Sequence, residues 1–162
     1  MRLKTQIDTL FQALIGQKVW GASVGWGSFV TLEFGRKRSY HRHYHGEWHL
    51  WLYLCEWELH SKGRILANSE SKKRVMQLGI ENLNGLELEH FAFDSQRMIT
   101  EFTFDHELHL RCKPYSDAAA DEECWMLFMP DGQVASLRES GLRYEPMDRI
   151  PATSIARREL PK

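Results

Sequence analysis

The sequence predicts an α+β fold with antiparallel sheet and two helices, and three observations lead to this class. Two segments, residues 3–14 and 70–81, repeat apolar residues at helical spacing. Most of the remaining chain consists of short apolar or alternating runs between glycine, proline and polar turns. The same order of elements recurs in both halves, which predicts an internal duplication of a helix-plus-β-meander unit.

The composition is typical of one globular domain. The chain has 162 residues, of which 43% are hydrophobic and 27% charged, and its formal net charge is −1. A chain of this length can bury about 70% of its unfolded surface. The small net charge provides no overall attraction to nucleic acid or to an anionic membrane. We therefore expect a single domain over residues 1–150, followed by a polar tail over residues 151–162.

Cysteine usage and hydropathy predict a cytoplasmic protein. Cys55, Cys112 and Cys124 are far apart in the sequence and form no CxxC pair, which argues against a disulfide framework and against a cysteine-based zinc site. The N-terminal segment is amphipathic rather than a continuous apolar signal sequence. No segment approaches the ~18 apolar residues of a membrane span, so we expect no membrane partner.

The elements of the first half follow from local patterns. Residues 3–14 place Leu3, Ile7, Leu10, Phe11 and Leu14 on one helical face. The stretch VWGASVGWGSFVTLEFG then reads as two strands joined by a tight turn at its glycines. Residues 47–59 are apolar on both faces, which is typical of one central strand covered on both sides.

The second half begins with a helix over residues 70–81, whose inner face is predicted to contain Val75, Met76 and Ile80. The runs LELEHFAF, ITEFTF, ELHLRC and CWMLFM then predict four strands, which we expect to form antiparallel sheet with both helices on one side. A turn at PDG precedes a terminal hairpin made of QVASL and LRYEP.

The two halves, about residues 3–66 and 69–145, share several short matches in the same order. Leu14-x-Gly16 recurs as Leu83-x-Gly85, and the apolar helix positions coincide at the same offset. Further along, TLEFG matches EFTFD, EWHL matches ELHL, and WEL matches WML. Since His49 falls on His109 in this alignment, we interpret His49 as a structural residue. The first half also has a basic, histidine-rich segment that the second half lacks.

This segment, residues 36–46, supports a metal hypothesis. His41, His43 and His45 alternate, so their imidazoles would share one face of an extended strand about 7 Å apart. Two such histidines can bind zinc, copper or nickel, and His49 would add a third. The neighbouring cations oppose a dication, and a solvated hairpin whose His and Arg side chains face water explains the pattern better. We therefore predict no cofactor and keep a divalent metal as an alternative.

The same segment offers a binding surface. Basic side chains that can bind phosphate groups are interleaved there with two tyrosines that can stack on a partner. Five of the six tryptophans lie in the first half; Trp48 and Trp57 are assigned to the core, and two beside glycines are candidates for exposure. The predicted binding surface comprises Arg36, Lys37, Arg38, Tyr40, His41, Arg42, His43, Tyr44, His45, Trp20 and Trp26.

We identify no catalytic residue. The stretch GWGSF lacks the lysine of a phosphate-binding loop, and no GxSxG motif is present. Cys55 reads as a buried, inert thiol, and Glu33, Glu56 and Glu58 read as carboxylates on a sheet surface.

Two stretches carry a resemblance to other proteins. GWGSFVTLEFG followed by GEWHLWLYLCEW resembles a motif pair from small, uncharacterised bacterial proteins. The pattern FDHELHLRC…ECWMLFMPDGQV is similar to small α+β domains among the immunity proteins of bacterial toxin systems. The resemblance covers most of residues 16–137 and transfers no catalytic residue. It implies a bacterial, non-enzymatic protein-binding domain that neutralises a toxin.

Three functions therefore follow from the sequence. The first is binding of another protein, and the second is binding of a small molecule or metal at the histidine-rich hairpin. The third is nucleic-acid binding through the same basic segment, which the absence of overall positive charge disfavours.

Overall fold

The computed structural model describes residues 2–40, 42–115 and 121–149. In this part of the chain it contains two α-helices, eleven strands in two antiparallel sheets and two short 3-10 helices, which confirms the predicted α+β class. The first half forms α1 (Arg2–Gln12), β1 (Trp20–Val24), β2 (Val30–Tyr40), β3 (His43–Leu52), β4 (Cys55–Ser61) and β5 (Arg64–Asn68). The second half forms α2 (Lys73–Glu81), β6 (Leu88–Asp94), β7 (Ile99–Phe104), β8 (Leu108–Pro114), β9 (Trp125–Phe128), β10 (Gln133–Arg138) and β11 (Gly141–Pro146).

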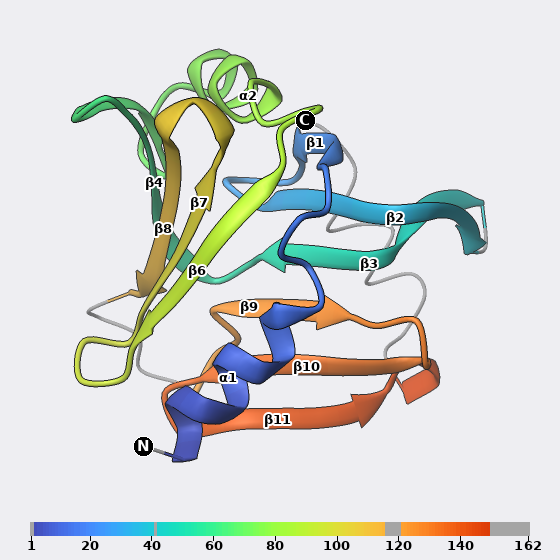
Figure 1. The fold of residues 1–162 in the computed structure, drawn as a ribbon. Coiled ribbons are helices and arrows are strands. Elements are labelled where there is room, and N and C mark those ends of the chain that lie inside the picture. Colours follow the sequence, from blue (N-terminus) through green and yellow to red (C-terminus); the bar gives the residue numbers. More distant parts are fainter. Residues whose placement is uncertain (1, 41, 116–120, 150–162) are drawn as a thin grey trace.

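The two sheets exchange strands between the halves of the chain. One sheet has the order β1-β2-β3-β9-β10-β11, and the other has the order β5-β4-β8-β7-β6. Each sheet therefore joins a three-stranded meander from one half to strands of the other half (Figure 1). A single core cluster lies between the sheets and includes the inner-face residues Leu32, Leu50, Trp57, Leu110 and Trp125.

The two helices lie at opposite ends of this core. Helix α1 contacts β6 and β11, and helix α2 contacts β1 and β5. In each case the two strands are edge strands of different sheets, so each helix bridges one gap between the sheets (Figure 1). The expectation of both helices on one side of one sheet was therefore wrong. The apolar face of α1 is anchored by Phe11, whose ring stacks on Phe91 with the ring centroids 4.2 Å apart.

Backbone hydrogen bonds connect the halves in matched pairs. The amide of Gly16 donates to the carbonyl of Leu88, and the amide of Gly85 donates to the carbonyl of Val19, at 2.8 and 2.7 Å. Both glycines have positive φ, 88° and 83°, which glycine adopts without steric cost. A bridge between Lys18 and Glu87 lies between these bonds. The two halves thus meet through the same local structure, used twice.

Residues 47–59 form two strands rather than the single strand that we predicted. The chain leaves β3 at Leu52 and enters β4, in the other sheet, at Cys55. The inner side chains of both strands enter the shared core, while Trp51 packs in a second cluster with Met126, Phe128 and Val134. Burial on both faces of β3 therefore produced the apolar pattern, but it did not reveal the change of sheet.

Several local predictions agree with the structure. Residues 25–29 form the β1–β2 turn, and β10 and β11 form the predicted terminal hairpin. Trp57 is buried, whereas Trp48 is half-buried against the core. Val75 is 42% exposed, so its assignment to the inner face of the second helix was wrong. Among the described residues, neither helix combines the length and hydropathy that a membrane crossing requires. The tail predicted at 151–162 lies outside the described residues.

Candidate metal centre

A β-bulge in the β2–β3 hairpin shapes the candidate site. Phe34 pairs with Trp48 and Lys37 pairs with Gly46, so Gly35 and Arg36 together lie opposite Glu47. Gly35 has a φ of 78°, and the amide of Arg36 donates a hydrogen bond to Glu47 Oε1 at 3.1 Å. Bulges of this kind bend the strand and increase its twist. The bulge therefore redirects the end of the hairpin relative to the sheet.

Glu33 and His49 form a buried pair across this hairpin. Glu33 is 5% exposed and His49 is 2% exposed. The two carboxylate oxygens lie 2.7 and 2.6 Å from His49 Nδ1, and Glu33 Oε1 also accepts a hydrogen bond from the amide of Gly46 at 2.8 Å. Because an ionised carboxylate can only accept, Nδ1 of His49 carries the proton and donates it. This geometry assigns Nε2 as the atom of His49 that can act as a metal ligand.

His45 completes the cluster. It is 8% exposed, and its ring centroid lies 4.3 Å from that of His49. The potential ligand atoms of Glu33, His45 and His49 all lie within 4.8 Å of one another. Two imidazoles and a carboxylate are ligand types that zinc and other divalent transition metals prefer.

A cavity of about 250 Å³ adjoins the two histidines. One side of it is apolar and includes Phe128, Met129 and Met147, while Arg38 and Glu47 supply charge. His49 contacts this apolar side directly, since its ring centroid lies 5.3 Å from that of Phe128. The complete lining is Arg38, Ser39, His45, Gly46, Glu47, His49, Phe128, Met129, Pro130, Gly132 and Met147. The cavity is large enough for water or a small ligand beside the histidines.

The structure brings together only some of the histidines predicted to form the metal site. His45 belongs to the cluster, His43 is half-buried and outside it, and His41 lies outside the described residues. Of these candidates, the structure therefore brings one, His45, into the cluster, where it lies beside His49.

The predicted binding-surface residues occupy three environments. Arg36, Lys37, Arg38, Arg42 and Tyr44 are exposed, with the Lys37 ammonium 4.5 Å from the centre of the Tyr44 ring. The backbone of Tyr40 pairs with that of His43. Trp20 is half-buried and donates from Nε1 to the carbonyl of Gly35, whereas Trp26, in the β1–β2 turn, is 48% exposed. Neither tryptophan lines the cavity beside the histidines.

Sequence reasoning missed Glu33, which was assigned to the sheet surface. It is buried because the outer face of β3, with His49 and Trp51, is itself covered. The alignment of the two halves could have indicated that Glu33 pairs with His49, because the corresponding residues of the second half form a pair. His109 occupies the position that corresponds to His49, and Thr103 hydrogen bonds to its Nδ1 at 3.1 Å. The first half has a carboxylate where the second has a hydroxyl.

A second buried cluster consists of the three cysteines. Their sulfur atoms lie within 4.8 Å of one another although the residues are far apart in the sequence, a proximity that the sequence spacing did not indicate. All three thiols are free and buried. Hydrogen bonds from the thiols of Cys124 and Cys55 lower the pKa of Cys112 to about 5. The same interactions with Cys112 raise the pKa of Cys55 and that of Cys124.

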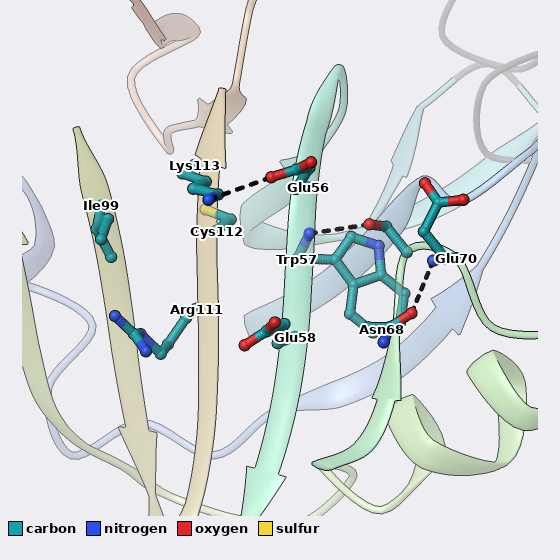
Figure 2. Close-up of a pocket in the computed structure, with 10 residues that line it drawn as sticks. Glu56, Trp57, Glu58, Asn68, Glu70, Ile99, Arg111, Cys112 and Lys113 are labelled. Atoms are coloured by element: carbon teal, nitrogen blue, oxygen red, sulfur yellow. Dashed lines mark hydrogen bonds and ion pairs between the residues drawn. The ribbon is translucent and has the colours of Figure 1, made fainter. Parts of the chain in front are cut away.

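A larger cavity, about 360 Å³, opens on β4 and β8. Figure 2 shows charged side chains from both strands at its edge, with Lys113 paired to Glu56 at 3.4 Å. Arg111, which also lines it, is paired with Glu101 at 3.0 Å. Since these charges largely neutralise one another, this cavity is a weaker candidate for a charged ligand than the histidine site.

Comparison of the chain with protein-family models, with curated proteins and with solved structures found no match.

Proposed function

We propose that this domain binds a divalent transition metal ion, such as zinc, through His45 and His49. The observation that carries the proposal is the convergence of two buried imidazoles and the Glu33 carboxylate within 4.8 Å. Burial of three ionisable side chains without a function is costly, because each loses hydration on folding. A bound cation offsets that cost and accounts for the position of the cluster beside a cavity.

Each residue has a distinct part in this site. His45 and His49 supply imidazole nitrogens, and Glu33 holds His49 by its Nδ1–H, which leaves Nε2 as the nitrogen of His49 available to the metal. Carboxylate–histidine–metal triads of this type fix the tautomer and raise the basicity of the ligand. The remaining coordination positions open into the 250 Å³ cavity, where water or an exogenous ligand completes the sphere.

The test measures zinc binding by protein that was purified without a metal-affinity column. Calorimetry with wild type is expected to give one zinc per chain, and the His45→Ala variant is expected to lose it. His43→Ala is the matched control, because this residue lies on the same strand outside the cluster. Zinc at a hundred times its Kd stabilises by about 2.7 kcal/mol, which raises Tm by about 5–10 °C. Wild type that binds no zinc, or binding that survives in His45→Ala, refutes the proposal.

A second candidate function, binding of an acidic partner protein, is favoured by the hairpin itself. The end of the hairpin extends beyond the rest of the described sheet. Its two arms, Lys37–Tyr40 and His43–Gly46, pair only with each other. The neighbouring strands stop earlier, because β1 pairs with β2 only up to Glu33 and β9 pairs with β3 only from His49 onward. The exposed end of the hairpin presents Arg36, Lys37 and Arg38. In this proposal the domain is a bacterial, cytoplasmic immunity protein that neutralises a toxin, as the resemblance in sequence suggests.

This second function is tested by affinity capture from the native host with wild type and with a variant in which Arg36, Lys37 and Arg38 are all replaced by Glu. Capture of one stoichiometric protein by wild type alone supports it. Capture of nucleic acid instead, or of the same protein by both forms, contradicts it.

The matched hydrogen bonds at Gly16 and Gly85 also support the proposal that the fold arose by internal duplication. Each half contributes a helix, a three-stranded meander and strands that join the opposite sheet. Sequences of homologues provide the test: alignments of residues 3–66 with 69–145 are expected to score above shuffled controls, and scores no better than those controls would reject the duplication.

A further inference from the structure

The three cysteines meet where the chain passes between the sheets. Cys55 is the first residue of β4, Cys112 lies in β8, and Cys124 immediately precedes β9. The exposures of these residues are 0%, 2% and 0%, and their sulfur atoms lie within 4.8 Å of one another. Three reduced thiols from three separate segments therefore face one point in the core.

The surroundings of this point are apolar. The thiols belong to the same core cluster as Trp57 and Trp125. The hydroxyl of Thr100 accepts a hydrogen bond from Trp125 Nε1 at 3.0 Å and also hydrogen bonds to Cys112. The charged residues on the same strands alternate to the opposite face, where Glu56 pairs with Lys113. The lowered pKa of Cys112 places a negative charge among these thiols. A bound species that leaves the site neutral removes this buried charge, which is otherwise unfavourable.

This restriction decides among the ions that thiolates bind. Three thiolates with zinc carry a net charge of −1, and three with a copper(I) ion carry −2. A trivalent ion that forms three bonds to sulfur yields a neutral adduct. Arsenic(III) is such an ion, and its preferred coordination by three ligands matches the number of thiols present.

We propose that Cys55, Cys112 and Cys124 form a three-thiol site for arsenic(III), taken up as arsenous acid. Three As–O bonds break and three As–S bonds form. The three hydroxyl groups leave as water, with protons taken from the thiols of Cys55 and Cys124 and, since Cys112 is already a thiolate, one proton from solvent. No electron is transferred, so the step needs no oxidant or reductant. The site is distinct from the histidine cluster and shares no residue with it.

An approach to the thiols exists from the larger cavity. Cys112 and Trp57 contribute to the lining of this 360 Å³ space, and Figure 2 shows Cys112 beside Lys113 on β8. Cys112 is thus expected to be the first thiol to react, followed by transfer to the other two.

The experiment is native mass spectrometry of the full chain with arsenous acid and a phosphine reductant, since a dithiol reductant would itself bind arsenic. Wild type is expected to gain one arsenic atom and to lose three hydrogens, and X-ray absorption is expected to show three sulfur neighbours and no oxygen. The variants Cys55→Ala, Cys112→Ala and Cys124→Ala are each expected to bind more than tenfold more weakly, about 1.4 kcal/mol.

His45→Ala serves as the matched control, because it removes the histidine cluster and leaves all three thiols in place. It is expected to bind arsenic as wild type does, which separates this proposal from the zinc proposal. If an alanine variant does not fold, as judged by circular dichroism, the serine variant at the same position replaces it. The mass change of wild type, a gain of one arsenic and a loss of three hydrogens, tests the three-thiol site without any variant. No mass gain at a large molar excess, or an adduct that keeps an As–OH group, overturns the three-thiol site.

Discussion

The Nδ1 atom of His49 lies 2.6 Å from Oε2 of Glu33, and this buried contact links two strands that are adjacent in the sheet and paired at that register. The corresponding contact in the other sheet joins Thr103 to His109 at 3.1 Å. The two pairs place a histidine at corresponding positions, but His49 is buried, His109 is half-buried, and the partners differ in charge. They therefore offer an internal comparison for the candidate metal centre.

Replacement of Glu33 by Gln tests the role of this charge. Gln keeps the shape of the side chain but is a weaker acceptor for His49 Nδ1–H, so we expect zinc affinity to fall about 10- to 100-fold, as is usual when such a partner is lost. Calorimetric zinc titration provides the measurement. The matched control is Thr103→Val, which removes the bond to His109; if it weakens zinc binding as much as Glu33→Gln does, the assignment of Glu33 is wrong.

Gly46 is expected to tolerate no side chain. A Cβ atom at this position would overlap the carbonyl oxygen and the amide nitrogen of Phe34, and both belong to the backbone of the neighbouring strand. We expect Gly46→Ala to lower the free energy of unfolding by about 3 kcal/mol or more. Gly132→Ala is the comparison, since its Cβ would meet nothing and its positive φ alone costs about 1 kcal/mol. Equal midpoints of urea unfolding for the two variants would contradict this expectation.

Thr100 and Trp125 form a buried hydrogen bond between strands of different sheets, with Trp125 Nε1 3.0 Å from Thr100 Oγ1. Thr100→Val leaves the indole N–H without this acceptor, and we expect a loss of about 1–3 kcal/mol in the free energy of unfolding. Combining it with Trp125→Phe removes both polar groups, so the two substitutions are expected to be non-additive. Strict additivity in a double-mutant cycle would show that the bond contributes nothing.

Asp121 is expected to make stability depend on pH. Hydrogen bonds from the hydroxyl and then from the amide of Ser140 hold the pKa of Asp121 below its ordinary value. Because the folded-state pKa is the lower one, this stabilisation is present above the unfolded pKa of about 3.9 and is lost as the pH falls through the folded-state value. Asp121→Ala should therefore lower the urea midpoint at neutral pH and have no effect in strong acid. An effect of the same size at both pH values would exclude the carboxylate as its source.

The sequence predictions were correct where a structural feature depends on residues close together in the chain, and they failed where it depends on contacts between distant segments. Helical periodicity located α1, whose Ile7 and Phe11 are buried, and glycine-rich stretches located the turn before β2. The change of sheet at Tyr53 and Leu54 was missed, because burial on both sides looks the same in one central strand and in two successive ones.

The candidate sites were harder to predict, since they depend on cross-strand register. The bulge at Gly35 changes which side chains of β2 and β3 share a face, and no local pattern reports this change. Glu33 lies before the bulge and was predicted to be a surface residue because its alternation does not show that the outer face of β3, with His49 and Trp51, is itself covered. The cysteines read as unrelated for the same reason, since only the packing of the two sheets brings Cys55 and Cys124 together.

The pairing of β3 with β9 also has a kinetic consequence. During synthesis the β1–β2–β3 meander must wait for residues 125–128 before its open edge is occupied, because the intervening strands join the other sheet. Contacts between such distant parts of a chain slow folding, and exposed strand edges invite aggregation in the meantime. The emerging chain is thus most prone to aggregate just before its last three strands leave the ribosome. Truncation in that region would leave the edge of β3 unpaired and would not produce a smaller folded domain.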